Sequence, residues 1–226
     1  MNLLNLIFTE TSLELVPREI LLHPSVRRNA KRRKKPPQET LLDRSLHHYA
    51  MNKLPNAEKR GRPDIIHFCL LLAMGSPLNQ MGKLNMEINT INDLRIKIDP
   101  LTRPPRDCLR FNSLMEQLLV NGAVPSKGEP LMKLYKESLE EQMKIIDPCK
   151  IIALSSYGEQ STFMKVAKIL SNEDSPAVFI GAYPSGPMKS EILEMSDHIY
   201  SVHSRSLEAW TVTSRIIYEY EKLMSD

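Results

Sequence analysis

The chain has 226 residues, enough for one sizeable domain, and its 42% hydrophobic and 25% charged residues are typical of a globular protein. It contains no run of eighteen apolar residues, so we expect no membrane span. The net charge of +3 is unevenly distributed: residues 1–113 hold 19 Lys and Arg against 11 Asp and Glu, and residues 114–226 hold 11 against 16. The basic first half suggests a polyanionic partner, for which nucleic acid is the leading candidate.

The cysteines and histidines indicate neither a disulfide framework nor a metal site. Cys69, Cys108 and Cys149 are odd in number and widely spaced, with no CxxC pair. This suggests reduced thiols in an intracellular, cytoplasmic protein. The adjacent His47 and His48 lack partners at ligand spacing, so we expect no zinc or other metal.

The first third of the chain combines a strand with a strongly basic segment. Residues 3–9 are apolar and no basic leader precedes them, although Glu10 follows, so we predict a strand and not a signal peptide. A helix is expected to begin at Pro17. Seven cations then crowd into residues 27–35, before two prolines. Such a block is usually solvated and often mobile, but it could also neutralise phosphates without reading base sequence. We favour an RNA-contacting arm over a merely solvated loop.

A second and a third helix are predicted next. Residues 38–53 show apolar side chains at helical spacing. Asp64 stands where an N-cap belongs, before an almost wholly apolar helix that ends at Gly75. Arg62 lies two residues before Asp64. If a close neighbour holds its guanidinium, Arg62 could be an oriented contact to a phosphate or a base.

A β-hairpin and an acidic helix are predicted around the middle of the chain. Residues 84–98 alternate apolar and polar side chains, with a turn around residues 89–93. This pattern is typical of a hairpin with one face exposed to solvent. Further along, residues 130–146 form an acidic pattern with helical periodicity, which we interpret as an amphipathic helix.

Between these two elements stands a group of three arginines. Two prolines make the approach stiff, and Asp107 is the expected N-cap of the next helix. Arg103, Arg106 and Arg110 thus fall on the entry and first turn of that helix, where a positive charge opposes the helix dipole. A bound phosphate would explain this arrangement. The alternative is three ordinary surface arginines.

The last third repeats the order strand, loop, helix. Apolar runs at residues 150–154, 177–180 and 198–202 predict short buried strands. In open α/β sheets, ligands bind outside the carboxyl ends of such strands. Gly181 and Gly186 bracket the loop after the second strand, so we predict a small-molecule site there. Ordinary βα turns are the alternative.

The C-terminal segment, residues 206–224, is predicted to be a helix with apolar side chains on more than one side. One side could pack on the sheet, and the other could pack on a second subunit.

Seven short segments spread over nearly the whole chain carry one resemblance. They are ELVP at 14–17, RPDIIH at 62–67, SPLN at 76–79, RPPRDCLRF at 103–111, LMEQLL at 114–119, FIGAYPSG at 179–186 and SLEAW at 206–210. Together they resemble the archaeal and eukaryotic family of pseudouridine N(1)-methyltransferases that act on small-subunit ribosomal RNA. That family belongs to the SPOUT class of knotted α/β methyltransferases.

The resemblance implies a fold and a cofactor. The fold is a mostly parallel sheet with helices on both faces and a C-terminal trefoil knot. One domain would span residues 1–226, with a basic helical insertion at 27–60 and a β-hairpin extension at 84–98. S-adenosylmethionine would bind mainly to the backbone of three loops, carried over here to Leu154, Gly181, Gly186, Val202, His203, Ser204, Arg205, Ser206 and Leu207. Ser206 stands where the family usually has proline.

The resemblance also implies a reaction and partners. The RNA-contacting arginines of the family fall on Arg62, Arg103, Arg106 and Arg110, and Asp64 would steady Arg62. We expect Arg62 and Asp64 to serve catalysis. We also expect the protein to form a homodimer and to have a role in ribosome assembly. Two other functions stay open: a non-enzymatic RNA-binding assembly factor, and a SPOUT methyltransferase that acts on transfer RNA or another base.

Overall fold

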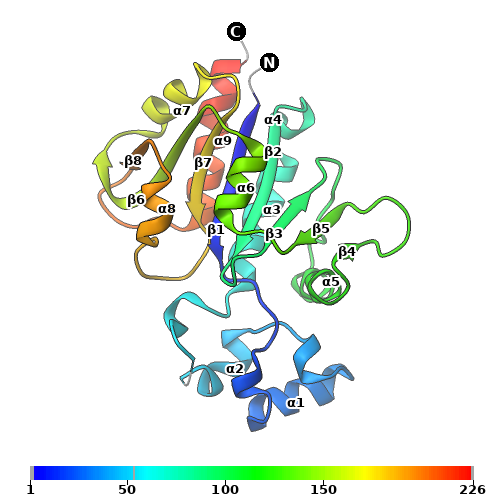
Figure 1. The fold of residues 1–226 in the computed structure, drawn as a ribbon. Helices are drawn as coiled ribbons and strands as arrows, with labels where there is room; N and C mark the ends of the chain where they lie inside the picture. Colours follow the sequence, from blue (N-terminus) through cyan, green and yellow to red (C-terminus); the bar gives the residue numbers. More distant parts are fainter. Residues whose placement is uncertain (1–2, 53, 225–226) are drawn as a thin grey trace.

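The computed structural model describes residues 3–52 and 54–224, which form a layered α/β fold. Its centre is an eight-stranded sheet in the order β4-β5-β3-β2-β1-β7-β6-β8 (Figure 1). Five strands, β2, β1, β7, β6 and β8, run parallel, and β3, β5 and β4 extend one edge in antiparallel order. The predicted mostly parallel sheet is therefore confirmed. The strands are β1 (Leu4–Thr11), β2 (Leu84–Thr90), β3 (Arg95–Ile98), β4 (Ala123–Val124), β5 (Met132–Tyr135), β6 (Lys150–Gln160), β7 (Pro176–Gly181) and β8 (His198–Ser201).

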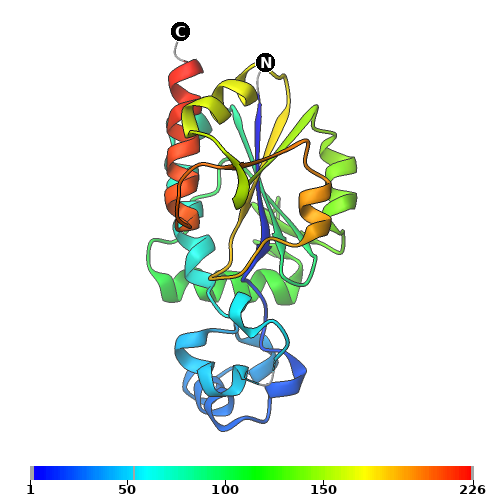
Figure 2. The same ribbon diagram turned by 90° about the vertical axis from the view of Figure 1, so that its left-hand side faces the viewer.

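Helices cover both faces of the sheet, as Figure 2 shows. The α-helices are α1 (Pro24–Arg33), α2 (Arg44–Met51), α3 (Pro63–Gly75), α4 (Pro77–Gln80), α5 (Cys108–Asn121), α6 (Leu139–Ile146), α7 (Phe163–Ser171), α8 (Ser190–Glu194) and α9 (Ala209–Met224). Helices α3, α7 and α9 lie on one face, and α6 and α8 on the other. Along β7, Val178 and Ile180 belong to the first core while Ala177 and Phe179 belong to the second. A strand buried on both faces needs such a continuous apolar run.

The segment between β1 and α3 forms a small lobe beyond the carboxyl end of β1 (Figure 1). It has an apolar cluster of its own: Val16, Ile20, Val26, Leu42, Ala50, Met51 and Leu54. The basic block is ordered, because residues 27–33 are part of α1, and its Arg27, Arg28 and Lys31 are exposed. Contact of this block with RNA stays a prediction. Val26 and Ala30 are buried against the lobe, and cations in the last turn favour the helix dipole.

Two predicted helices of the first half have different limits in the structure. Of the predicted helix at 38–53, the described residues 38–52 are helical only as a 3-10 turn, Pro37–Glu39, and as α2, which Asp43 caps, and residue 53 lies outside the described residues. Asp64 is not an N-cap: α3 begins at Pro63, Arg62 occupies the N-cap position, and no side chain caps it. Proline fits the first helical position, where its missing N–H costs nothing, so the helix begins before Asp64.

The predicted hairpin exists, but its polar face is only partly exposed: Lys97 is exposed, whereas Glu87 and Arg95 are buried. Strand β2 pairs with β3 in antiparallel order and also with β1 in parallel order. Glu87 of β2 is buried and binds Arg95 of β3, and Gln142 of α6 donates to the same carboxylate at 3.0 Å. Two polar residues of the alternating pattern, Glu87 and Arg95, thus form an interior ion pair that α6 covers.

Two further boundaries differ from the predictions. Residues 132–135 form strand β5 and not the start of a helix, and α6 begins only at Leu139, after the Ser138–Glu141 capping box. Strand β6 does not end at Leu154. It continues to Gln160 after a break in its register with β8 between Leu154 and Glu159. The other strands of the last third and the Asp107 cap are confirmed. Among the described helices, none is long and apolar enough for a membrane span.

Candidate functional site

A pocket of about 270 Å³ opens at the carboxyl ends of β7 and β8, beside the register break in β6. Its lining residues come from three segments, within residues 154–157, 180–188 and 200–212. The second and third segments begin at the carboxyl ends of β7 and β8, and the first lies within β6, where its register with β8 breaks. Parallel strands end at the same edge of a sheet. The predicted site at this edge thus coincides with a real cavity.

Most of the predicted cofactor residues lie on the wall of this pocket. They are Leu154, Gly181, Gly186, Val202, His203, Arg205, Ser206 and Leu207, whereas Ser204 is not part of the lining. The wall combines apolar side chains with hydroxyl groups and loop backbone. An adenosine moiety needs such a surface, because its base is apolar on two faces and its ribose carries hydroxyls. The residues present therefore fit S-adenosylmethionine.

The loop after β7 requires glycine at two points. A Cβ atom on Gly181 would lie 2.6 Å from the ring of Tyr183, so any side chain there would force that ring to move. Gly186 has a φ angle of +98°, a conformation that other residues rarely adopt. This geometry lets the ring of Tyr183 fold back against the end of the strand beside the pocket.

A buried ion pair between Glu10 and Lys59 lies next to the same loop. Glu10 is 1% exposed, and its carboxylate accepts from Lys59 Nζ at 2.7 Å and from the backbone N–H of Lys189 at 3.0 Å. Lys59 Nζ also lies 4.4 Å from the centroid of the Tyr183 ring. Glu10 itself has a φ angle of +48°, where an ordinary residue is strained. The lobe that contains Lys59 is thus fastened to the pocket loop.

The sequence holds little that points to this ion pair. Lys59 and Tyr183 belong to no motif that assigns them a role. Glu10 is the one local signal, since a charge inside a buried strand needs a partner. That partner is 49 positions away along the chain, so no local pattern could identify it.

Arg62 and Asp64 form a two-pronged ion pair. Arg62 Nε lies 2.8 Å from Asp64 Oδ1, and Nη2 lies 2.7 Å from Oδ2. Hydrogen bonding to Asp64 raises the pKa of Arg62, and the charges of Glu208 and Asp43 raise it further. Asp64 therefore orients the guanidinium, as the fixed-guanidinium hypothesis expects.

Backbone contacts place Arg62 next to the pocket. Its N–H donates to Ser12 Oγ at 2.8 Å, and the N–H of Ser12 donates to the carbonyl of Ala182 at 2.9 Å. Ala182 follows Gly181 in the pocket loop. Glu208, whose charge acts on Arg62, follows Leu207 in another pocket loop. Arg62 accordingly lies between two of the three loops.

The other three predicted arginines lie beyond Arg62, away from the pocket wall. Arg103, Arg106 and Arg110 are all exposed and none lines the pocket. Their segment is held in place by His67, whose Nε2 donates to the carbonyl of Pro105 at 2.7 Å. In space, α5 packs against β4 and β5, at the opposite end of the sheet from β8.

One electrostatic contact connects the start of α5 with the Arg62–Asp64 pair. Burial raises the pKa of Cys108, the first residue of α5, and the charges of Asp43 and Asp64 raise it further. The helix start therefore lies within electrostatic range of Asp64. The start of α5, with the exposed Arg106 and Arg110, therefore lies on the same side of the molecule as the Arg62–Asp64 pair. Among the described residues, no group of three His, Cys, Asp or Glu side chains could hold a metal ion.

These features define an α/β protein with a small-molecule pocket at the edge of its parallel sheet and with an oriented arginine, Arg62, linked to the loop after β7. The chain belongs to the EMG1/NEP1 methyltransferase family, whose model matches residues 6–221. The family resemblance carried by the seven segments is therefore confirmed.

Individual relatives match over almost their whole length. The chain is 42% identical over 221 residues to the ribosomal RNA small subunit methyltransferase Nep1 of Staphylothermus marinus. The aligned region covers 97% of this chain and 96% of that protein. It is 43% identical over 214 residues to the protein of the same name from Saccharolobus solfataricus, with 94% of each covered. The crystal structure of Archaeoglobus fulgidus Nep1 bound to S-adenosylhomocysteine matches with a TM-score of 0.88 and 35% identity over 100% of both chains. The trefoil knot and the roles of single site residues stay predictions.

Proposed function

We propose that this protein transfers the methyl group of S-adenosylmethionine to N(1) of a pseudouridine in small-subunit ribosomal RNA, as a step of ribosome assembly inside the cell. The observation that carries the proposal is the pocket at the sheet edge, with Arg62 linked to its loop after β7 through Ser12 and Ala182. Relatives named as ribosomal RNA small subunit methyltransferases support the RNA class. The Archaeoglobus fulgidus structure, with S-adenosylhomocysteine bound, supports the cofactor.

Backbone groups around Leu154, Gly181 and Val202 would hold the cofactor in this pocket, with Ser206 and Leu207 closing the third loop. When bound, S-adenosylmethionine supplies a methyl group that is already activated by its sulfonium. The protein then needs only to align the attacking ring nitrogen and to exclude water. This requirement explains why loop backbone and apolar side chains make up much of the wall.

Arg62 is the group we assign to charge stabilisation. N(1) of pseudouridine loses a proton during methylation, so negative charge develops on the ring and its carbonyl oxygens. Asp64 binds Nε and Nη2 of Arg62, and within the described residues no hydrogen bond involves Nη1. That N–H group can donate to a carbonyl oxygen of the base, in a direction that Asp64 fixes beforehand. The proton goes to water or to a carboxylate.

The exposed arginines of α5 and its approach would bind the RNA backbone while the target nucleotide leaves its stack. Base-modifying enzymes generally require such extrusion. Arg103, Arg106 and Arg110 lie farther from the pocket than Arg62, which suits contacts to neighbouring phosphates. We also propose that two copies of the chain form a homodimer.

A methylation assay with matched RNA oligonucleotides tests the proposal. One oligonucleotide contains a single pseudouridine in a small-subunit ribosomal hairpin, and the control contains uridine at that position. We expect methyl transfer only to the first, at N(1), as located by mass spectrometry. Equal transfer to both, or transfer to a transfer RNA instead, would overturn the assigned specificity. Failure to bind S-adenosylhomocysteine in calorimetry would favour a non-enzymatic assembly factor.

A further inference from the structure

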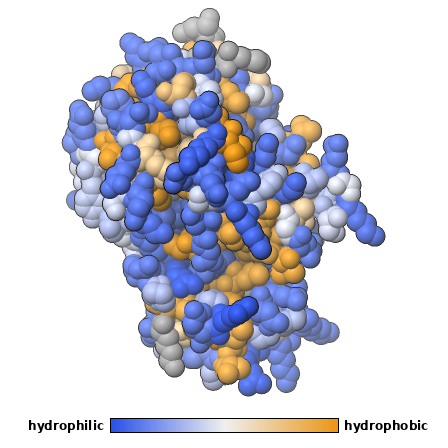
Figure 3. Space-filling model, viewed as in Figure 1, coloured by the Kyte–Doolittle hydropathy of each residue, from blue (hydrophilic) through white to orange (hydrophobic). Residues whose placement is uncertain are grey.

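Helix α1 presents a row of cations that the site described above does not use. Arg27, Arg28, Lys31 and Lys34 are exposed on or directly after this helix. None of them takes part in the ion pairs found among the described residues. Figure 3 shows hydrophilic side chains projecting from the lower lobe, where α1 and α2 lie.

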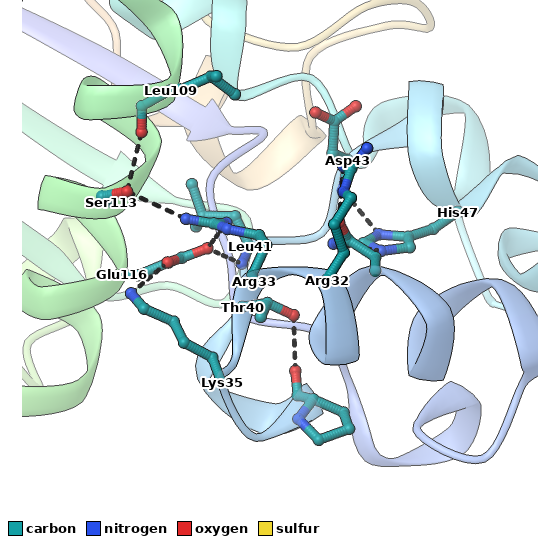
Figure 4. Close-up of polar contacts among 12 residues, drawn as sticks. Arg32, Arg33, Lys35, Thr40, Leu41, Asp43, His47, Leu109, Ser113 and Glu116 are labelled. Carbon is teal, nitrogen blue, oxygen red and sulfur yellow. Dashed lines mark hydrogen bonds and ion pairs between the residues drawn. The ribbon is translucent and has the colours of Figure 1, made fainter.

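The end of α1 is fastened to α5 by one buried carboxylate. Glu116 of α5 is 1% exposed and accepts from Arg33 Nη1, from Lys35 Nζ at 2.7 Å and from the backbone N–H of Leu41 at 3.0 Å (Figure 4). Arg33 Nη2 also donates to Ser113 Oγ at 3.0 Å. A buried carboxylate with three donors is costly to displace, so α1 and α5 keep a fixed relative position.

A shallow groove runs along α5 next to this junction. It has a volume of about 310 Å³, and its lining includes Pro105, Leu109, Arg110 and Ser113. Ser113 belongs to both features, since it lines the groove and accepts from Arg33. The groove therefore leads from the arginines at the start of α5 towards the exposed cations of α1.

From this arrangement we propose that α1 and the α5 groove form one extended RNA-contacting surface, which binds the backbone of nucleotides flanking the target. Glu116 is its positioning residue, because it holds α1 in line with Arg110. The proposal rests on the proposed function, since it extends the substrate surface of the same enzyme. The RNA segment bound by this surface would lie outside the hairpin whose target nucleotide reaches the pocket.

The chemistry of α1 favours RNA over a protein partner. Throughout α1, which is fully described, no large hydrophobic side chain is exposed, whereas protein interfaces usually centre on buried aromatic or aliphatic anchors. Several cations on one helix match the repeated phosphates of a nucleic acid. Leu109 and Pro105 in the groove add an apolar surface on which an unpaired base can stack.

The first test compares two charge-removing variants. Arg28→Ala/Lys31→Ala removes two exposed cations from α1, and Lys165→Ala/Lys168→Ala removes two at the same spacing from α7. Fluorescence anisotropy measures binding to a short target hairpin and to the same hairpin extended on both sides, over a range of salt concentrations. For the extended RNA we expect the α1 variant alone to bind about tenfold more weakly, with a salt slope smaller by about 1.4 to 1.8, the value for two lost phosphate contacts.

The short hairpin separates this inference from the proposed function. Both variants should bind and methylate it like the wild type at saturating RNA. Unchanged binding of the extended RNA by the α1 variant, or an equal loss in both variants, would overturn the inference and leave the methyltransferase intact. If even the wild type fails to methylate the short hairpin, the proposed function fails instead.

A second test addresses Glu116. Glu116→Gln keeps the shape of the side chain but removes the charge that binds Arg33 and Lys35. We expect weaker binding of the extended RNA only, and no further loss when Glu116→Gln is combined with Arg28→Ala/Lys31→Ala, because both act on one surface. Additive losses would show that Glu116 does not act through α1. A merely structural role would lower hairpin methylation as well.

Discussion

At the scale of single residues, the pocket depends on charges that lie outside its wall. Glu10 and Lys59 form a buried ion pair behind the loop after β7, and Asp64 orients Arg62 at the rim. The Glu10–Lys59 pair connects the lobe with the pocket loop, whereas Arg62 and Asp64 both belong to the start of α3, which a hydrogen bond from the N–H of Arg62 joins to Ser12. Removal of one member leaves the other charge without its partner, so the effect should depend on which member is removed and how deeply it is buried.

Arg62→Ala should slow methyl transfer far more than it weakens cofactor binding. The guanidinium is expected to stabilise charge that develops only during the reaction, and loss of such a donor typically costs about 10²- to 10³-fold in turnover. We expect the Kd for S-adenosylhomocysteine, measured by calorimetry, to change less than about threefold. Ser190→Ala, on the short helix α8, is the control. Equal losses in turnover and cofactor affinity would contradict the catalytic role of Arg62.

Lys59→Met should destabilise the protein and weaken cofactor binding together. It leaves the carboxylate of Glu10 buried without its cation, which typically costs about 3 to 5 kcal/mol, and it removes the contact of Lys59 with the Tyr183 ring. The double variant Glu10→Gln/Lys59→Met should recover part of the stability, because the uncompensated charge is gone. Urea denaturation and calorimetry with S-adenosylhomocysteine measure the two effects. A double variant less stable than Lys59→Met would contradict this account.

At the scale of elements, helix α2 contains a buried histidine that makes the lobe sensitive to acid. His47 is fully buried, and its ring contacts the backbone N–H of Asp43 and the side chain of Asn29. Burial lowers the pKa of His47 below its ordinary value of 6.5, although the charge of Asp43 opposes the shift and His23 adds to it. The unfolded lobe therefore binds a proton more readily than the folded lobe.

The stability of the lobe should accordingly fall on acidification. The contribution of neutral His47 is complete above pH 6.5, the ordinary pKa, and is lost as the pH falls from there towards the lowered pKa of the folded state. Hydrogen exchange of α1 and α2 between pH 7.5 and 5 measures this loss, as an order-of-magnitude faster opening at the acid end. His47→Gln should abolish that pH dependence. Unchanged acid sensitivity in this variant would assign the effect to another group.

Local sequence patterns predicted most of the elements that are determined by residues close along the chain. The apolar runs of β7 and β8 and the Asp107 cap need only short-range information, and all were found. The errors concern elements that distant contacts decide. Residues 132–135 form a strand because β3 pairs with them, and Glu87 and Arg95 on the polar face of residues 84–98 are buried because α6 covers them.

The candidate site likewise has features that the sequence predicted and features that only distant contacts decide. Its glycine-bracketed loop follows from strand and turn patterns, and the individual pocket residues followed from family resemblance. Neither source reveals that Arg62 reaches the pocket through Ser12 and Ala182, or that Glu10 joins Lys59. Those contacts join segments about 50 or more positions apart, and only the folded arrangement of β1, the lobe and β7 creates them.

At the scale of the whole molecule, helices α3 and α9 leave an apolar surface beside the pocket. Phe68 and Leu72 lie one turn apart on α3 and are 46% and 43% exposed. The ring of Phe68 lies 5.4 Å from that of Trp210 at the start of α9, directly after the third pocket loop. Adjacent exposed side chains of this kind mark an interaction surface, and a second copy of the chain is the partner we predict for it.

Phe68→Asp/Leu72→Asp should therefore convert a dimer into a monomer, because two charges cannot be buried in an apolar interface without partners. Light scattering coupled to size-exclusion chromatography measures the mass of each species. Leu22→Asp, at an exposed leucine of the lobe, is the control and should stay dimeric. The interface would lie next to the pocket, so the monomer should also bind S-adenosylhomocysteine more weakly. A wild-type protein that is monomeric at micromolar concentration, or a variant that remains dimeric, would contradict the prediction and leave the apolar surface of α3 and α9 to another partner.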